Sequence, residues 1–193
     1  MAGQALNGQV FLMGYSQGGG ACVATLRAIQ NEAPDEFNVV TTLGGSGPYN
    51  VSGVQFDFIA NNPFYPTPGY IPFVLLGNQP IYQNLYNDVS EVLVPPWDAD
   101  LPMLLDRNHP VRVALRDNDL LDFTPKSPLW MTFCMGDEQV DFRNAIVAWI
   151  VYKLIRRSPA PVIPLFLGPG DHGDCTLPSL VLGKLLFDAQ RIE

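Results

Sequence analysis

The sequence predicts an α/β fold with a mostly parallel sheet, and three observations support this prediction. Gln9–Met13 is a buried apolar run that ends in a glycine-rich turn and is followed by a helical pattern. Phe37–Leu43 is a second apolar, β-branched run, so strand, helix and strand follow one another at the spacing of a βαβ unit. Two later runs, Leu129–Met135 and Val162–Leu167, read as further strands, each followed by a helix.

The helices of this predicted core follow from apolar spacing and capping residues. We expect the first over Gly20–Asn31 and a long amphipathic helix over Asp141–Arg157, which ends in basic residues. The last helix is expected to begin near Leu177, with Thr176 as its N-cap. The residues of the first helix that are expected to face inward are Ala21, Val23, Ala24, Leu26 and Ile29.

Between about residues 51 and 124, prolines and aromatic residues are frequent and no clear strand pattern occurs. This segment is interpreted as a helical insertion into the α/β core. The sequence thus predicts a core formed by residues 1–50 and 128–193, with residues 51–127 inserted. The expected helical pieces of the insertion are Pro72–Gly77, Ile81–Leu93 and Leu101–Asp106.

The composition excludes several classes of function. Of the 193 residues, 47% are hydrophobic and 16% are charged, which is typical of a globular domain rather than a disordered chain. A net charge of −8 without a basic cluster argues against nucleic-acid and anionic-membrane partners. The longest apolar helical stretch, Ala145–Tyr152, is too short to cross a bilayer. The first eight residues lack the features of a signal peptide, and the cellular compartment stays open.

The turn after the first strand has the pattern G-x-S-x-G, formed by Gly14-Tyr15-Ser16-Gln17-Gly18. A strand before it and a helix after it are the context of a nucleophile elbow, in which the serine hydroxyl projects from a strained turn. Ser16 is therefore the candidate nucleophile, and the backbone N–H of Gln17 is a candidate oxyanion donor. Gly14 and Gly18 lie two residues before and two residues after the serine. We expect that a side chain at either position would collide with the neighbouring strand or helix.

A serine nucleophile needs a base, and the chain has two histidines. His172 lies in a glycine-rich loop directly after the last predicted strand, whereas His109 lies within the insertion. Loops at the carboxyl ends of parallel strands converge on the ligand site, so His172 is the candidate base. We expect His109 to be a surface residue without a catalytic role.

The base in turn needs a carboxylate that fixes its tautomer. Asp137 follows the third strand and Gly136, and it is the favoured candidate. Glu138 and Asp141 stay open as alternatives, because one residue of turn geometry decides which carboxylate points inward. The chain order of serine, acid and histidine is the one used by the fold that carries nucleophile elbows.

These motifs resemble the carboxyl-terminal half of an α/β-hydrolase, and in particular the bacterial secreted esterase and lipase-like branch. The resemblance covers residues 9–50 and 128–190, with Gly-Tyr-Ser-Gln-Gly-Gly at the elbow and Gly-Asp-Glu-Gln-Val at the acid. It implies a partial α/β-hydrolase sheet with a helical cap at residues 51–127. It also implies an ester hydrolase with Ser16 as nucleophile, Asp137 as acid, His172 as base and Gln17 as oxyanion donor. Cutinases share the elbow pattern, but they carry the serine far into the chain and have no cap of this size.

The resemblance has further implications for partners and compartment. We expect a small ester substrate with an apolar group, no cofactor and no metal ion, and the family suggests a secreted or periplasmic protein. The three cysteines form no metal-ligand pattern, but Cys134 and Cys175 are expected to lie near each other because the acid and histidine loops must meet.

The chain departs from the family before the elbow, where only about eight residues precede the nucleophile strand. Family members have several strands there, and a loop among them supplies the second oxyanion donor. The nucleophile strand is therefore expected at the edge of the sheet, with exposed apolar surface around Phe11 and Leu12. Self-association or a complementing amino-terminal segment is expected in consequence. The alternatives are a serine peptidase and an incompetent fragment that acts as a binding chain.

Overall fold

The computed structural model describes residues 7–62, 64–89 and 106–192. The chain divides into two compact units, the first formed by residues up to Asn50 and from Leu120 onward, the second by Val51–Asp119. The sequence placed the end of the insertion at residue 127. Leu120 and Phe123 instead belong to the core of the first unit, because both are buried against its helices and strands.

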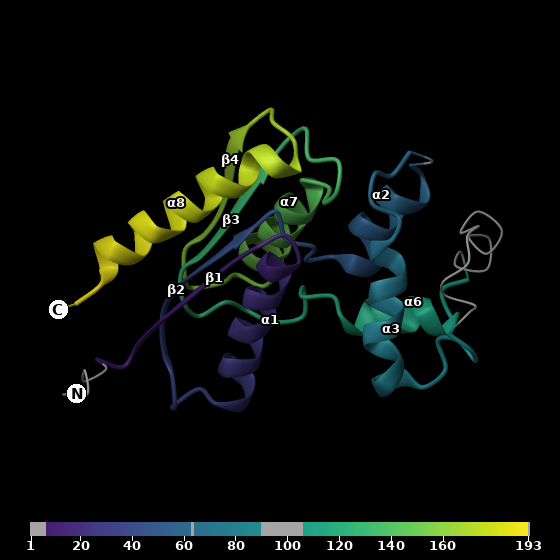
Figure 1. Cartoon of the computed structure of the whole chain (residues 1–193). Helices are drawn as coiled ribbons and strands as arrows, with labels where there is room; N and C mark the ends of the chain where they lie inside the picture. Colours follow the sequence, from purple (N-terminus) through teal and green to yellow (C-terminus); the bar gives the residue numbers. More distant parts are fainter. Residues whose placement is uncertain (1–6, 63, 90–105, 193) are drawn as a thin grey trace, which may run out of the picture. The chain divides into compact units, whose positions relative to one another are not determined.

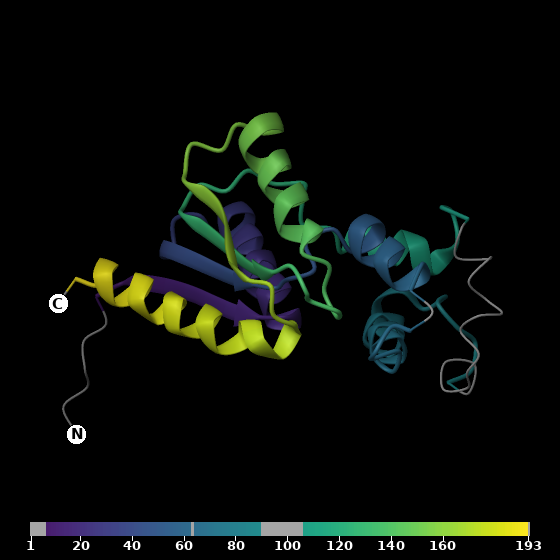
Figure 2. The same cartoon turned by 90° about the horizontal axis from the view of Figure 1, so that it is seen from above.

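The first unit contains a four-stranded sheet. Its strands lie side by side in Figures 1 and 2. The strands are β1 (Gln9–Tyr15), β2 (Asn38–Gly45), β3 (Leu129–Cys134) and β4 (Val162–Gly168). They lie in the order β1-β2-β3-β4, and every neighbouring pair is parallel. The predicted α/β fold with a parallel sheet is confirmed, and each strand begins and ends within two residues of its predicted bounds.

Helices cover both faces of the sheet and produce three layers (Figure 2). One face is covered by α1 (Gln17–Glu32) and by α7 (Arg143–Trp149), which continues into the π-helical segment η2 (Ile150–Ile155). The long helix α8 (His172–Gln190) covers the other face. A parallel sheet covered on both faces buries its strands, and β3 is buried at all but one position.

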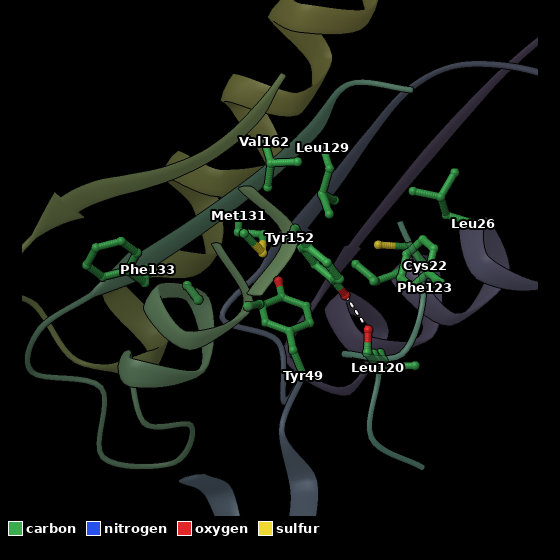
Figure 3. Packing of buried hydrophobic residues seen from close by; sticks show 13 residues of the cluster. Cys22, Leu26, Tyr49, Leu120, Phe123, Leu129, Met131, Phe133, Tyr152 and Val162 are labelled. Carbon is green, nitrogen blue, oxygen red and sulfur yellow. Dashed lines mark hydrogen bonds between the residues drawn. The ribbon is translucent and has the colours of Figure 1, made fainter. Parts of the chain in front are cut away.

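The main core lies between the sheet and the α1 and α7 layer (Figure 3). Val23 and Leu26 of α1 are fully buried there, as predicted, whereas Ala21 is exposed and Cys22 takes an inward position. Ala24 and Ile29 are partly buried, so the predicted inward face is wrong at Ala21 and omits Cys22. The buried residues of this cluster are Cys22, Val23, Leu26, Tyr49, Leu120, Phe123, Leu129, Met131, Phe133, Ala145, Ala148, Tyr152 and Val162.

The start of α8 differs from the prediction by five residues. The helix begins at His172, not near Leu177, and its N-cap is Asp171 rather than Thr176. Asp171 and Asp174 form a reciprocal capping box, in which each side chain accepts from the other's backbone N–H. The glycines around Asp171 are typical of a loop, but the reciprocal bonds of the capping box start the helix there.

The helix predicted over Asp141–Arg157 begins at Arg143 and changes to π-helical turns from Ile150. Asp141 lies before the helix and its carboxylate accepts from the Arg143 N–H at 2.8 Å. The predicted and observed elements thus share most of their length, but the acidic residue at the start lies before the helix and binds the N–H of its first residue.

The second unit contains helical segments without a strand in its described residues. These are η1 (Val51–Gln55), α2 (Phe56–Ala60), α3 (Tyr70–Tyr82) and α6 (Pro110–Asp117). Leu85, Val111 and Ala114 form a small separate core, with Leu75, Tyr82, Tyr86 and Leu115 packed against it.

The predicted helical pieces of the insertion agree in part with this unit. Pro72–Gly77 lies within α3. Ile81 and Tyr82, where the helix predicted over Ile81–Leu93 begins, are the last residues of α3. Gln83 adopts a left-handed conformation that ends α3, so the prediction is wrong for residues 83–89, and its last residues lie outside the described part. Most of Leu101–Asp106 also lies outside it, and α6 was not predicted.

Strand β1 lies at one edge of the described sheet, as expected, and none of its residues is fully buried. Phe11 is not openly exposed, however, because its ring packs against Phe187 of α8 with centroids 4.9 Å apart. Leu12 packs against the main core. Within the described ranges, no helix combines the length and hydropathy needed to cross a membrane.

Candidate active site

Ser16 lies on the sharp turn between β1 and α1. Its φ angle is 58°, a region that non-glycine residues rarely adopt. Its N–H donates to the Gly45 carbonyl at the end of β2 over 2.8 Å, and its own carbonyl accepts from Gly19. The turn is therefore fixed at both ends, and strain of this kind often marks functional sites.

The close packing of this turn requires small residues, although not at both predicted positions. A Cβ at Gly14 would lie 2.0 Å from the Gly18 carbonyl oxygen, so Gly14 is sterically required, as expected. The expectation for Gly18 is wrong, because a Cβ there meets nothing within 4 Å. The contact with the neighbouring strand falls on Gly19, whose Cβ would lie 2.5 Å from the Gly45 oxygen.

Gln17 is the first residue of α1 and is exposed. The first N–H groups of a helix have no acceptor within the helix, and the positive end of its dipole lies there. The N–H of Gln17 therefore combines the position directly after Ser16 with the electrostatics that favour a developing negative charge.

Asp137 lies in the loop after β3, and its side chain is almost completely buried. One carboxylate oxygen, Oδ1, accepts from the backbone N–H groups of Gln139 at 3.0 Å and Val140 at 2.8 Å. Val140 is buried and packs beneath the loop. These two backbone bonds fix the direction of the carboxylate independently of its contacts with other side chains.

The imidazole of His172 lies against this carboxylate. His172 Nδ1 is 2.8 Å from Oδ2 and 2.9 Å from Oδ1 of Asp137, and both residues are buried. A carboxylate at Nδ1 favours the tautomer that carries its proton there and leaves Nε2 free to accept one. The structure therefore brings together the predicted acid and base from loops that lie 35 residues apart in the sequence.

The two alternative acids make other contacts. Glu138 Oε2 accepts the backbone N–H of His172 at 3.0 Å, so it binds the same residue at its main chain. Asp141 forms an ion pair with Arg143 and accepts from its Nε at 2.8 Å. Of the three carboxylates, it is that of Asp137 that contacts the imidazole.

His109 lies in the second unit and has a local role. It is the N-cap residue of α6, and its Nδ1 accepts the Val111 N–H at 3.3 Å. Pro110 occupies the first helical position, where the missing N–H costs nothing.

The acid loop and the histidine loop are joined covalently. Cys134 and Cys175 form a disulfide with a Cα–Cα separation of 5.9 Å, which confirms the predicted proximity of the two cysteines. Cys134 ends β3 and Cys175 lies in the first turn of α8, three residues after His172. A Cβ at Gly136 would lie 2.4 Å from the Pro169 oxygen, so the approach of the two loops depends on this glycine.

Solved structures of similar fold are crystal structures of hydrolases. A rice cell wall degrading esterase LipA from Xanthomonas oryzae is 23% identical with a TM-score of 0.76, over 96% of this chain and 60% of that protein. A putative hydrolase from Legionella pneumophila is 18% identical with a TM-score of 0.69, over 97% and 59%. Candida antarctica lipase A in its closed state is 18% identical with a TM-score of 0.59, over 96% and 50%. This chain has the α/β-hydrolase fold.

The match is to part of that fold, since the chain spans about 60% of the length of the first of these structures. No protein-family model matches the sequence, and no curated protein matches it by sequence. The assignment to the α/β-hydrolase fold therefore rests on the arrangement of the parallel strands and the helices around them.

In an α/β-hydrolase the elbow serine is approached by the base at the carboxyl edge of the sheet. Here Tyr15, which precedes Ser16, donates its hydroxyl to the His172 carbonyl over 2.5 Å, so the elbow and the histidine loop are in contact. The bond between Ser16 Oγ and His172 Nε2 stays a prediction. The G-x-S-x-G pattern leaves the position of Tyr15 unspecified, so no local signal in the sequence predicts this contact.

The described residues contain no group of three or more His, Cys, Asp or Glu side chains that could hold a metal ion. Asp137 and His172 are paired with each other, and Cys134 and Cys175 are bonded.

Proposed function

We propose that this chain is a serine hydrolase that cleaves carboxylic esters through an acyl-enzyme, with Ser16 as nucleophile, His172 as base and Asp137 as acid. The observation that carries the proposal is the buried pair of His172 Nδ1 and Asp137 at 2.8 Å, which contacts the elbow through Tyr15. The esterases and lipases among the structures of the same fold support an ester substrate.

The proposed mechanism begins with attack of Ser16 Oγ on the ester carbonyl carbon, while its proton passes to His172 Nε2. The carboxylate of Asp137 stabilises the imidazolium that forms. The N–H of Gln17 donates to the oxyanion of the tetrahedral intermediate. Return of the proton from His172 to the leaving oxygen releases the alcohol and leaves an acyl group on Ser16. Water then attacks the acyl group with His172 again as base, which releases the carboxylic acid product and restores the Ser16 hydroxyl.

An apolar acyl or aryl group is the proposed substrate feature, with residues 51–127 proposed as the cap. Aromatic and aliphatic side chains in this segment are well exposed, among them Phe64 at 88% and Phe73 at 71%. These are the side chains proposed to contact the apolar group of the substrate.

A fluorophosphonate probe tests the proposal, since it labels a serine only where a neighbouring base activates it. We expect stoichiometric labelling on Ser16, found by mass spectrometry of the digested protein, and no labelling of the S16A variant. An unlabelled chain, or equal labelling of S16A, would contradict the proposal and favour the alternative of an incompetent binding chain.

The alternative of a serine peptidase is separated by a second assay. Matched p-nitrophenyl ester and p-nitroanilide substrates with the same acyl group differ in the leaving group alone. We expect turnover of the ester and slower or absent turnover of the anilide. Faster cleavage of the anilide would assign the site to peptide hydrolysis.

A further inference from the structure

Tyr15 links the two ends of the proposed triad. It is the last residue of β1 and is covalently bonded to Ser16, and its hydroxyl donates to the carbonyl oxygen of His172 over 2.5 Å. The two rings also contact each other, with centroids 5.0 Å apart and planes inclined by 45°. A single side chain thus spans from the nucleophile to the base.

His172 is held by bonds from two directions. Asp137 binds its Nδ1 and Glu138 binds its N–H, and both of these carboxylates belong to the loop after β3. The bond to the His172 carbonyl from Tyr15 comes instead from the nucleophile strand. The acid loop fixes the base relative to the acid, whereas Tyr15 fixes it relative to the serine.

We propose that Tyr15 is a positioning residue, whose hydroxyl sets the distance between His172 and Ser16. This inference rests on the proposed function, because it assigns a role within the same triad. The approach of base to nucleophile is the geometry to which such catalysis is most sensitive, since a displacement of about 1 Å can cost about 10²-fold in rate.

The chemistry of the phenol suits this role. Burial is the main cause that raises the pKa of Tyr15 above its usual value. Hydrogen bonding to the Ser46 and Thr176 side chains opposes this rise, and the charges of Asp137 and Glu138 add a smaller contribution to it. The hydroxyl therefore keeps its proton across the neutral range and can donate to a carbonyl oxygen throughout it. Thr176 Oγ1 also contacts the His172 carbonyl, at 3.3 Å from within α8, and it moves with the helix.

The test compares two hydroxyl deletions. Tyr15→Phe removes the bond to His172, and Tyr152→Phe is the matched control, because Tyr152 also donates to a backbone carbonyl, that of Leu120 in the core (Figure 3). For Tyr15→Phe we expect kcat to fall by about tenfold or more with little change in KM, as loss of positioning predicts. For Tyr152→Phe we expect wild-type kcat at temperatures where the variant is folded.

A spectroscopic readout reports the position of His172 without turnover. The downfield proton resonance of the His172–Asp137 bond is expected to shift or broaden in Tyr15→Phe and to stay unchanged in Tyr152→Phe. Replacement of Tyr15 by 4-aminophenylalanine restores an N–H donor at the same place and is expected to recover part of kcat.

Equal kcat and an unchanged resonance in Tyr15→Phe would overturn the proposal. So would equal losses in both Tyr→Phe variants, because these would show a contribution to folding alone. The failure of the proposed function has a different signature, namely ester turnover that survives in S16A or is absent from the wild type. The resonance still tests the positioning role in that case.

Discussion

His172 and Asp137 form the interaction on which the proposed chemistry depends most directly. Both side chains are buried, and the carboxylate is fixed by two backbone N–H groups as well as by the imidazole. A buried carboxylate held in this way cannot turn to another partner without leaving hydrogen bonds unmade, which is costly. The acid is therefore set by the fold of its own loop.

The first prediction concerns the relative cost of losing each member of the triad. We expect Ser16→Ala and His172→Ala each to reduce kcat for a p-nitrophenyl ester on the order of 10⁴-fold or more, because the residues act as a unit. Asp137→Ala should cost somewhat less. The control is His109→Ala, in which the changed residue caps α6 and kcat is expected to stay unchanged. Turnover like that of the wild type in His172→Ala would refute the assignment.

The second prediction concerns Cys22, the free cysteine of the described residues. Burial raises the pKa of the Cys22 thiol to about 12, from an ordinary value of 9.0. The thiolate is the reactive form, so we expect no alkylation by iodoacetamide in the native protein at pH 8.5. Under denaturing conditions one cysteine should react without reductant and three after reduction, as counted by intact mass.

The raised pKa of Cys22 also makes the free energy of unfolding depend on pH. Between pH 9 and pH 12 the unfolded chain loses a proton that the folded chain keeps, so the free energy of unfolding falls as pH rises through this range. Cys22→Ala is the control for this effect, since the variant lacks the titrating group. Fast alkylation of native Cys22 would show that the thiol is not buried in solution.

At the scale of elements, the site is built where a loop after β3 meets the start of α8. The Cys134–Cys175 disulfide, the capping box of Asp171 and the contact of Glu138 with the His172 N–H all lie at this junction. An anion at the start of a helix is favoured by the helix dipole, so Glu138 stabilises the first turn that carries the base. The proposed base, His172, therefore lies at the start of a helix.

The third prediction concerns the disulfide, whose cysteines are 41 residues apart in the sequence. A crosslink that closes a loop of this length lowers the entropy of the unfolded chain by an amount worth about 4 kcal/mol. We expect the double variant C134S/C175S to lose up to this free energy of unfolding in urea titrations. Dithiothreitol should destabilise the wild type and leave the double variant unaffected. Equal stability of oxidised and reduced wild type would contradict this role.

At the scale of the whole molecule, the described part of the first unit exposes sheet edges and apolar side chains. β1 and β4 are the edges of the described sheet, and an edge strand presents N–H and C=O groups that can pair with another chain. On α8, Leu177, Val181 and Leu185 are exposed by 69%, 49% and 61% and follow one another at four-residue spacing. This spacing places them on one side of the helix, so they form an apolar stripe.

The fourth prediction is that the isolated chain self-associates or needs a complementing segment. We expect light scattering after size exclusion to show a mass that rises with protein concentration. The double variant V181K/L185K should shift the distribution toward the monomer, because it places charges in the exposed stripe.

A mass that stays that of the monomer at every protein concentration would contradict this prediction.

The sequence by itself determined the strands and the candidate residues, because these depend on local patterns. Apolar runs set the strands within two residues, the glycine-serine turn marked Ser16, and the positions of Asp137 and His172 after strands followed from parallel topology. Local patterns predict the ends of elements less well. The glycine-rich sequence around Asp171 is typical of a loop, so the start of α8 is predicted five residues too late. The helix predicted over Ile81–Leu93 is present only at Ile81 and Tyr82 among the described residues, because the left-handed conformation of Gln83 ends α3.

Only the tertiary structure decided which groups meet. The choice among Asp137, Glu138 and Asp141 depends on the direction of three carboxylates within five residues after β3. Each of them accepts a different backbone N–H, and these bonds set the directions. The contact of Tyr15 with the His172 carbonyl joins residues 157 apart in the sequence, and no local pattern predicts it. Long-range contacts arise from the packing of α8 and the strands against each other, which the periodicity of any one segment does not contain.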